Sequence, residues 1–129
     1  MDARSCRFTK THEWVRLEGD VATVGISDFA VKELTDLVYI DLPKVGARVE
    51  RGGRLGEVES VKAVSDLYAP VAGEVLAVNS PLADDLAALS SDPYGAGWIA
   101  KIRVADAAAA VQGLLDQGAY AAFCAAGGH

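Results

Sequence analysis

Short runs of β-type residues separated by closely spaced turns fill the middle of this chain and limit it to a small β-fold. Runs with apolar residues at alternating or successive positions predict strands at 37–42, 55–59, 64–68 and 74–78. Glycine- and proline-containing segments at 43–46, 51–54 and 70–73 predict turns between them. Many short strands with tight turns favour a small barrel or sandwich over a parallel sheet.

The N-terminal part of the chain continues this pattern and adds one helix. Strands are predicted at 14–17 and 21–26. Gly19 lies between them in a turn that suits its freedom to adopt positive φ. Ser27 is a favoured N-cap residue and predicts a short helix that ends near Leu34, with Phe29 and Leu34 as its core contacts.

The C-terminal part predicts one more strand and helices. Residues 80–91 are expected to form a loop with one helical turn, and 98–104 the last strand. An alanine-rich helix is predicted over 106–117, with Gly118 at the position that follows its end. A short second helix extends the helical segment to about residue 124.

Charge and composition exclude several classes of partner. The 12 basic and 18 acidic residues give a net charge of −6, which repels nucleic-acid phosphates and anionic membrane surfaces. No apolar run reaches the roughly 20 residues of a transmembrane helix, and the first residues lack the apolar segment of a secretory signal. We therefore expect a cytoplasmic protein with two reduced cysteines, binding neither nucleic acid nor membranes.

Catalytic and metal-binding patterns are equally scarce. His12 and His129 are far apart in the sequence and are its only histidines, so neither a metal site nor a Ser/His/Asp triad is expected. The glycine-rich stretch 52–56 lacks the spacing of a nucleotide-binding loop. An enzyme is therefore the weakest reading of the sequence.

Lys62 lies between two predicted strands in the segment 55–68. Serine is favoured at the first position of a type I turn, so a turn over 60–63 would place Lys62 at the tip of a hairpin. A lysine at such a tip is exposed and accessible to a modifying enzyme, but most exposed lysines serve only solubility. Spacing alone therefore leaves its role open.

The sequence around Lys62 resembles the lipoyl-lysine signature of the glycine cleavage system H protein family. The similar segments are 59–63 (Glu-Ser-Val-Lys-Ala) with Asp66, 69–75 (Ala-Pro-Val-Ala-Gly-Glu-Val), 8–14 (Phe-Thr-Lys-Thr-His-Glu-Trp), 24–30 (Val-Gly-Ile-Ser-Asp-Phe-Ala) and 92–98 (Asp-Pro-Tyr-Gly-Ala-Gly-Trp). They occur in the family's order over nearly the whole chain. Leu37, Leu86 and Ser90 depart from the family pattern, and all three lie outside the lysine hairpin.

The resemblance implies a fold and a cofactor. It implies a mainly β fold of the lipoyl/biotinyl type, a flattened β-barrel or barrel-sandwich hybrid, with a short helix in the N-terminal half and C-terminal helices. Residues 1–129 would form a single lipoyl-carrier domain, with lipoic acid attached covalently to Lys62 as N6-lipoyl-lysine.

The resemblance also implies a non-catalytic shuttle. A lipoylating enzyme would load the chain, which would then carry the aminomethyl group of glycine from a pyridoxal-phosphate-dependent glycine decarboxylase to a tetrahydrofolate-dependent aminomethyltransferase. Dihydrolipoamide dehydrogenase would reoxidise the dihydrolipoate. Two carboxylates, Glu13 and Asp66, are candidate contacts for the loaded arm, because they could hold its cationic amine in a cleft; two solvated surface acids are the alternative.

Other readings remain open at this stage. The chain could be an H-like protein that only relays lipoate, a biotinyl carrier domain, or a lipoyl domain of a 2-oxoacid dehydrogenase. Biotin carriers usually flank their lysine with methionines, whereas Val61 and Ala63 flank Lys62 here. A β-rich interaction module with an unmodified Lys62 is the alternative from a different class.

Overall fold

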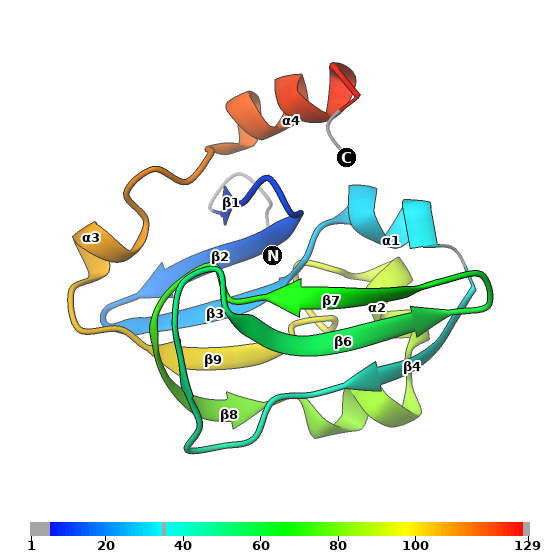
Figure 1. Cartoon of the computed structure of the whole chain (residues 1–129), viewed down its shortest axis with the longest axis horizontal. Coiled ribbons are helices and arrows are strands. Elements are labelled where there is room, and N and C mark those ends of the chain that lie inside the picture. Colours follow the sequence, from blue (N-terminus) through cyan, green and yellow to red (C-terminus); the bar gives the residue numbers. More distant parts are fainter. Residues whose placement is uncertain (1–5, 35, 128–129) are drawn as a thin grey trace.

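Two antiparallel sheets form the body of the protein (Figure 1). The computed structural model describes residues 6–34 and 36–127. The strands are β1 (Arg7–Phe8), β2 (Glu13–Glu18), β3 (Val21–Ile26), β4 (Leu37–Asp41), β5 (Arg48–Val49), β6 (Arg54–Ser60), β7 (Val64–Tyr68), β8 (Gly73–Val78) and β9 (Ala100–Arg103). The helices are α1 (Asp28–Leu34), η2 (Ser80–Asp84), α2 (Ala87–Ser91), α3 (Ala107–Ala110) and α4 (Gln117–Ala125).

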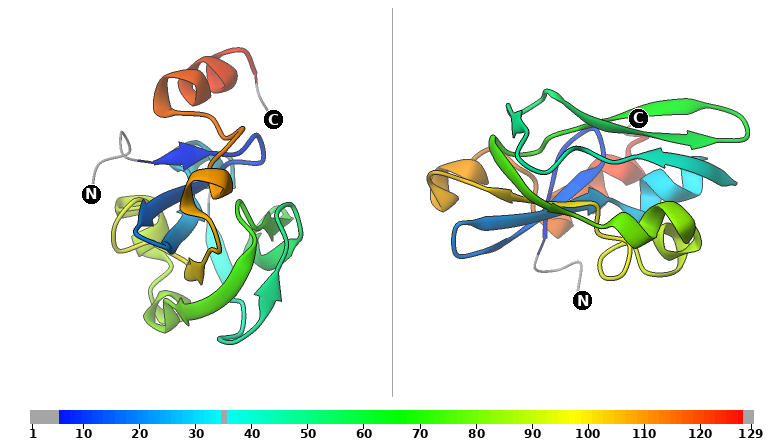
Figure 2. Two further views of the ribbon diagram at one scale, coloured as in Figure 1. Left: turned by 90° about the vertical axis from the view of Figure 1, so that its left-hand side faces the viewer. Right: turned by 90° about the horizontal axis from the view of Figure 1, so that it is seen from below.

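The larger sheet has the strand order β1-β2-β3-β9-β8-β5, and the smaller has the order β4-β6-β7. Viewed from below, the β6–β7 hairpin lies on the opposite side of the molecule from β2 and β3 (Figure 2, right). Apolar side chains from both sheets fill the space between them, including Val24 and Ile102 from one and Val58 and Leu67 from the other. The predicted mainly β, barrel-sandwich fold is confirmed; the assignment of 1–129 to a single domain stays a prediction.

The predicted strands of the N-terminal and middle regions are confirmed within one or two residues at each end. The predicted final strand at 98–104 is too long, because β9 contains only Ala100–Arg103. The preceding Trp98 and Ile99 are in irregular backbone, although Ile99 is buried in the core. Side-chain burial and strand pairing therefore begin at different residues here.

Helix α1 begins as predicted. The Ala30 amide donates to Ser27 Oγ over 3.2 Å, so Ser27 caps the helix. The buried core residue of α1 is Val31. Of the two predicted core contacts, Leu34 packs against the core. Phe29 is half-buried and lies outside the core cluster. Phe29 instead contacts the His12 ring, with centroids 4.9 Å apart.

The segment between β8 and β9 contains more helix than predicted. The structure has the two short helices η2 and α2 where one helical turn was expected. Leu82 and Leu89 are buried in the core and hold both helices against the sheets. Neither helix has a side-chain cap, so no local N-cap residue marks their starts in the sequence.

The predicted alanine-rich helix over 106–117 is wrong. Helix α3 contains only four residues, and the chain leaves it through Gly113, whose φ is +81°. Leu115 then forms a β-bridge with Phe8. Asp116 caps the start of α4 by accepting from the Ala119 amide, so Gly118 lies inside a new helix and not after an old one. A long-range pairing thus overrides local helix propensity.

A second hydrophobic cluster attaches α4 to the sheets. Its buried members are Cys6, Phe8, Trp14 and Tyr120. Figure 1 shows α4 beside β1, at the end of the larger sheet. No helix in 6–34 or 36–127 is long and apolar enough to cross a membrane, and the cytoplasmic location stays a prediction.

Candidate functional site

The turn at the tip of the β6–β7 hairpin carries Lys62. The Ser60 amide donates to the Ala63 carbonyl over 2.8 Å, and the Ala63 amide donates to Ser60 Oγ over 3.1 Å. The Val61 amide donates to the Asp36 carbonyl over 3.0 Å, which fastens the tip to the start of β4. The turn is therefore held by Ser60 on one side, as predicted, and by the start of β4 on the other.

The Lys62 side chain is fully accessible on this turn. Lys62 and its neighbours Val61 and Ala63 are exposed, with Val61 75% and Val64 59% exposed. Within the described residues, no hydrogen bond or ion pair holds the Lys62 amine. Figure 1 places the hairpin tip at the opposite end of β7 from the turn that leads into β8. A modifying enzyme can therefore reach the amine without unfolding any element.

The outer face of the small sheet carries a row of carboxylates. Asp41, Glu57 and Asp66 are paired across β4, β6 and β7. Arg54 bonds to Glu57 over 2.8 Å and to Asp66 over 3.3 Å. The hydrogen bond that Arg54 Nε donates to Asp66, together with the charges of the nearby acids, raises the pKa of Arg54. The row is therefore acidic but partly neutralised.

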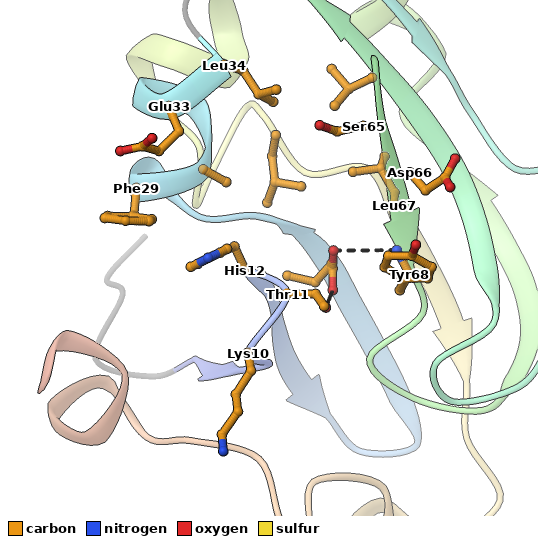
Figure 3. A pocket seen from close by; sticks show the side chains of 14 residues that line it. Lys10, Thr11, His12, Phe29, Glu33, Leu34, Ser65, Asp66, Leu67 and Tyr68 are labelled. Carbon is orange, nitrogen blue, oxygen red and sulfur yellow. Dashed lines mark hydrogen bonds between the residues drawn. The ribbon is translucent and has the colours of Figure 1, made fainter. Parts of the chain in front are cut away.

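A cleft of about 390 Å³ lies on the other side of β7. Helix α1 forms one wall with Phe29, Glu33 and Leu34, β7 forms the other, and His12 and Thr11 lie between them (Figure 3). Ser65 in this wall is three residues from Lys62, about 10 Å along an extended strand. A flexible group on Lys62 can therefore fold back into the cleft.

Glu13 is a buried carboxylate of this cleft, only 3% exposed. Its Oε1 accepts from the hydroxyls of Thr9 (2.9 Å) and Thr11, and its Oε2 accepts from the Tyr68 amide over 3.4 Å. Burial raises the pKa of Glu13 above its ordinary value of 4.5, and the hydrogen bonds oppose this effect without cancelling it. A cation that entered the cleft would favour the charged form of this carboxylate.

Glu13→Gln is expected to remove a pH dependence of stability. Below pH 4.5 the carboxyl is protonated whether the chain is folded or unfolded, so ionisation has no effect. Between pH 4.5 and the raised pKa, the unfolded chain ionises this carboxyl while the folded chain keeps it protonated. Wild-type stability should therefore fall relative to Glu13→Gln, by about 1.4 kcal/mol for each unit by which the pKa is raised, and then stay constant.

Urea unfolding between pH 4 and pH 8 measures this difference. Glu74→Gln is the matched control, since Glu74 is an exposed glutamate on β8. It should differ from wild type by no more than about 0.5 kcal/mol throughout. A constant gap between wild type and Glu13→Gln across this range would contradict the burial argument.

The structure places Glu13 inside the cleft and Lys62 outside its lining, on the turn that precedes β7. Asp66 borders the cleft, but its carboxylate bonds to Arg54 on the outer face. Figure 3 shows the Asp66 side chain directed away from α1, whereas Ser65 is directed toward it. Of the two predicted carboxylates, Glu13 is the one inside the cleft.

Sequence reasoning missed the wall formed by α1. His12 and Phe29 line the cleft as an aromatic pair. His12 has φ +74°, a conformation that few residues other than glycine adopt. Neither the helical period nor the predicted N-cap indicates that the first turn of α1 faces a cleft. Only the similarity of the segments 8–14 and 24–30 to one family placed both in a common pattern.

The three residues that depart from the family pattern lie together outside the cleft. Leu37, Leu86 and Ser90 line a hollow of about 530 Å³ between α1 and α2. None of them lines the cleft next to β7. Leu37, however, begins β4 and pairs with Ser60 at the base of the lysine turn, so this departure adjoins the lysine hairpin.

Known proteins match this chain over nearly its full length. The sequence profile of the family described as "Glycine cleavage H-protein" matches residues 6–127. A glycine cleavage system H protein of Phenylobacterium zucineum is 50% identical over 119 residues, covering 92% of this chain and 98% of that protein. One of Methylacidiphilum infernorum is 58% identical over 97 residues, covering 75% and 76%.

A solved structure agrees with the sequence matches. The crystal structure of a glycine cleavage system H protein from Mycobacterium marinum superposes with a TM-score of 0.86 at 41% identity. It covers 95% of this chain and 98% of that one. With the exposed hairpin lysine, the adjacent cleft and these matches, the chain belongs to the glycine cleavage H-protein family.

Proposed function

We propose that this protein is a lipoate carrier of glycine cleavage, with lipoic acid attached to the Nζ of Lys62 through an amide. The observation that supports this most directly is an accessible lysine at the tip of a hydrogen-bonded hairpin turn, in a chain of the H-protein family. The lipoylating enzyme would act on that amine.

The residues around Lys62 fit such a group. The cofactor would supply a disulfide able to take up the aminomethyl group from the glycine decarboxylase, yield it to the aminomethyltransferase and be reoxidised by dihydrolipoamide dehydrogenase. The chain supplies a fixed turn, an unhindered amine and the exposed apolar side chains of Val61 and Val64 beside it. Such a platform raises the local concentration of the arm at each partner.

The chain itself would not catalyse these reactions. The hard chemistry belongs to the cofactor and to the partner active sites. Glu13 accepts hydrogen bonds from the hydroxyls of Thr9 and Thr11 and from the Tyr68 amide. Its position suits binding of a cation.

The cleft would hold the cationic amine of the cargo between visits to partners. Glu13 lies inside the cleft and would gain a charge partner when the amine enters. Asp66 would contribute less, since Arg54 already neutralises its carboxylate. The apolar side chains of Phe29, Leu34 and Leu67 would limit the access of water.

Removing the Glu13 charge is expected to release the cargo faster. After loading by the decarboxylase and removal of that enzyme, Glu13→Gln should release ammonia and formaldehyde about tenfold faster than wild type, the size of a lost charge-assisted hydrogen bond. Asp66→Asn should have a smaller effect, and Glu74→Gln, on the other sheet, none. Unchanged release in both cleft variants would show that the cleft does not hold the amine.

A glycine–bicarbonate exchange assay tests the proposed pathway. The lipoylated protein should support exchange by the glycine decarboxylase, and the unlipoylated protein should not. A lipoylated protein that fails in exchange but donates its lipoate to another complex would instead be a lipoate-relay protein. Biotin on Lys62 would identify a biotinyl carrier, and both results would reject the proposal.

A further inference from the structure

The Tyr120 hydroxyl joins the C-terminal helix to both segments that form one side of the cleft. It lies 2.6 Å from His12 Nδ1 and 2.5 Å from Ser27 Oγ. Tyr120 is 5% exposed and Ser27 is fully buried. Burial raises the pKa of Tyr120, so the hydroxyl stays protonated at neutral pH and can donate one bond while accepting another.

Both partners of this hydroxyl position the cleft wall. Ser27 caps α1, since its Oγ accepts from the Ala30 amide and its carbonyl accepts from the Val31 amide. His12 packs its ring on Phe29 from the same helix, with centroids 4.9 Å apart. The Ser27 amide donates to the His12 carbonyl over 2.9 Å. The cap of α1 and the turn before β2 are thus one hydrogen-bonded unit.

The rest of the Tyr120 side chain is held independently of its hydroxyl. Its ring stacks on Phe8 at 4.3 Å between centroids, with an angle of 6° between the planes. Asp116 caps α4 one turn earlier. Removing the oxygen alone should therefore leave α4 in place while removing its hydrogen bonds to His12 and Ser27.

We propose that Tyr120 is a positioning residue for the cleft, through which the C-terminal helix fixes the wall formed by α1 and His12. Phe29, Glu33 and Leu34 of α1 line the cleft between α1 and β7. The cleft therefore keeps its shape only while α1 is fixed. Tyr120 does not line that cleft itself. Its effect on the cargo rests on the proposed function, whereas its effect on α1 does not.

Tyr120→Phe in the full chain tests this role, with amide hydrogen exchange as the first measurement. In the unlipoylated protein, the Ala30 and Val31 amides should exchange about tenfold faster, as expected for one lost buried hydrogen bond. The Ala63 amide at the hairpin tip should not change. Tyr39→Phe is the matched control, because Tyr39 is an exposed tyrosine on β4, and should leave all three amides unchanged.

A second variant and a second measurement complete the test. Ser27→Ala removes the Oγ that bonds to the Tyr120 hydroxyl and accepts from the Ala30 amide. It should accelerate exchange of the same α1 amides. In the loaded protein, Tyr120→Phe should release ammonia and formaldehyde several-fold faster than wild type. Lipoylation at the remote tip should proceed at the wild-type rate.

The outcomes separate this inference from the proposed function. Unchanged α1 amides in Tyr120→Phe, or equal acceleration of α1 and the hairpin tip, would overturn the positioning role. If aminomethylated dihydrolipoamide free in solution decays as slowly as the cargo of the wild-type protein, the cleft gives no protection. That result would reject the proposed parking of the cargo but not the α1 result.

Discussion

Lys62→Arg is expected to abolish lipoylation and all glycine–bicarbonate exchange that depends on this protein. Arginine keeps the positive charge and much of the length, but its guanidinium stays protonated and cannot form the amide. The side chain is exposed at a turn held by backbone bonds and by Ser60, so the fold should tolerate the change. Stability should change by no more than about 0.5 kcal/mol.

Intact-mass measurement of protein from a lipoate-competent host checks this result. Wild type should carry a lipoyl mass increment, and Lys62→Arg should carry none. Lys44→Arg is the matched control: it changes another exposed turn lysine in the same way and should keep the increment. An unmodified wild type would favour a plain interaction module, and a modified Lys62→Arg would place the attachment elsewhere.

Gly73→Ala is expected to be the most destabilising single methyl addition in the described glycines. Gly73 begins β8 and packs against β9, where an added Cβ would overlap the carbonyl oxygen of Arg103 and lie 2.8 Å from Ile102 Cγ2. Backbone cannot move aside as a flexible side chain can. We expect a loss of about 3 kcal/mol and a Tm lower by roughly 10 °C.

Thermal and urea unfolding measure this loss, with Gly118→Ala as the control. Gly118 is exposed in the first turn of α4, and its added Cβ would meet only Asp116 Oδ1 at 3.6 Å. Alanine should leave stability unchanged or raise it by up to about 1 kcal/mol. Equal effects of the two substitutions would show that the β8–β9 approach is not tight. The expected loss in Gly73→Ala would also explain why glycine occupies position 73 in the segment 69–75.

Local signals predicted most of the sheets. The turn at Gly19, the cap at Ser27 and the hairpin over 55–68 depend on residues close in sequence, so patterns of a few residues contain the necessary information. The C-terminal region failed for the opposite reason. The bridge of Leu115 to Phe8 and the new cap at Asp116 interrupt a segment that otherwise favours helix.

The two predicted carboxylates show the same limit at the site. Strand alternation separates Asp66 from Ser65, but it does not say which face is covered. The position of α1 across from β7 made the Ser65 side the cleft wall, whereas Asp66 bonds to Arg54 on the outer face. Glu13, from a distant strand, was brought to the same cleft by the pairing of β2 with β3.

The sequence by itself determined that Lys62 lies in an exposed turn. The turn depends on Ser60, only two residues away, and the family resemblance rests on short segments. Only the tertiary structure decided that the strand after Lys62 borders a cleft. That cleft is built by the turn before β2, by α1 and by β7, which are far apart in the chain. Its shape depends on Tyr120, which is 108 residues from His12, and no local pattern records such a contact.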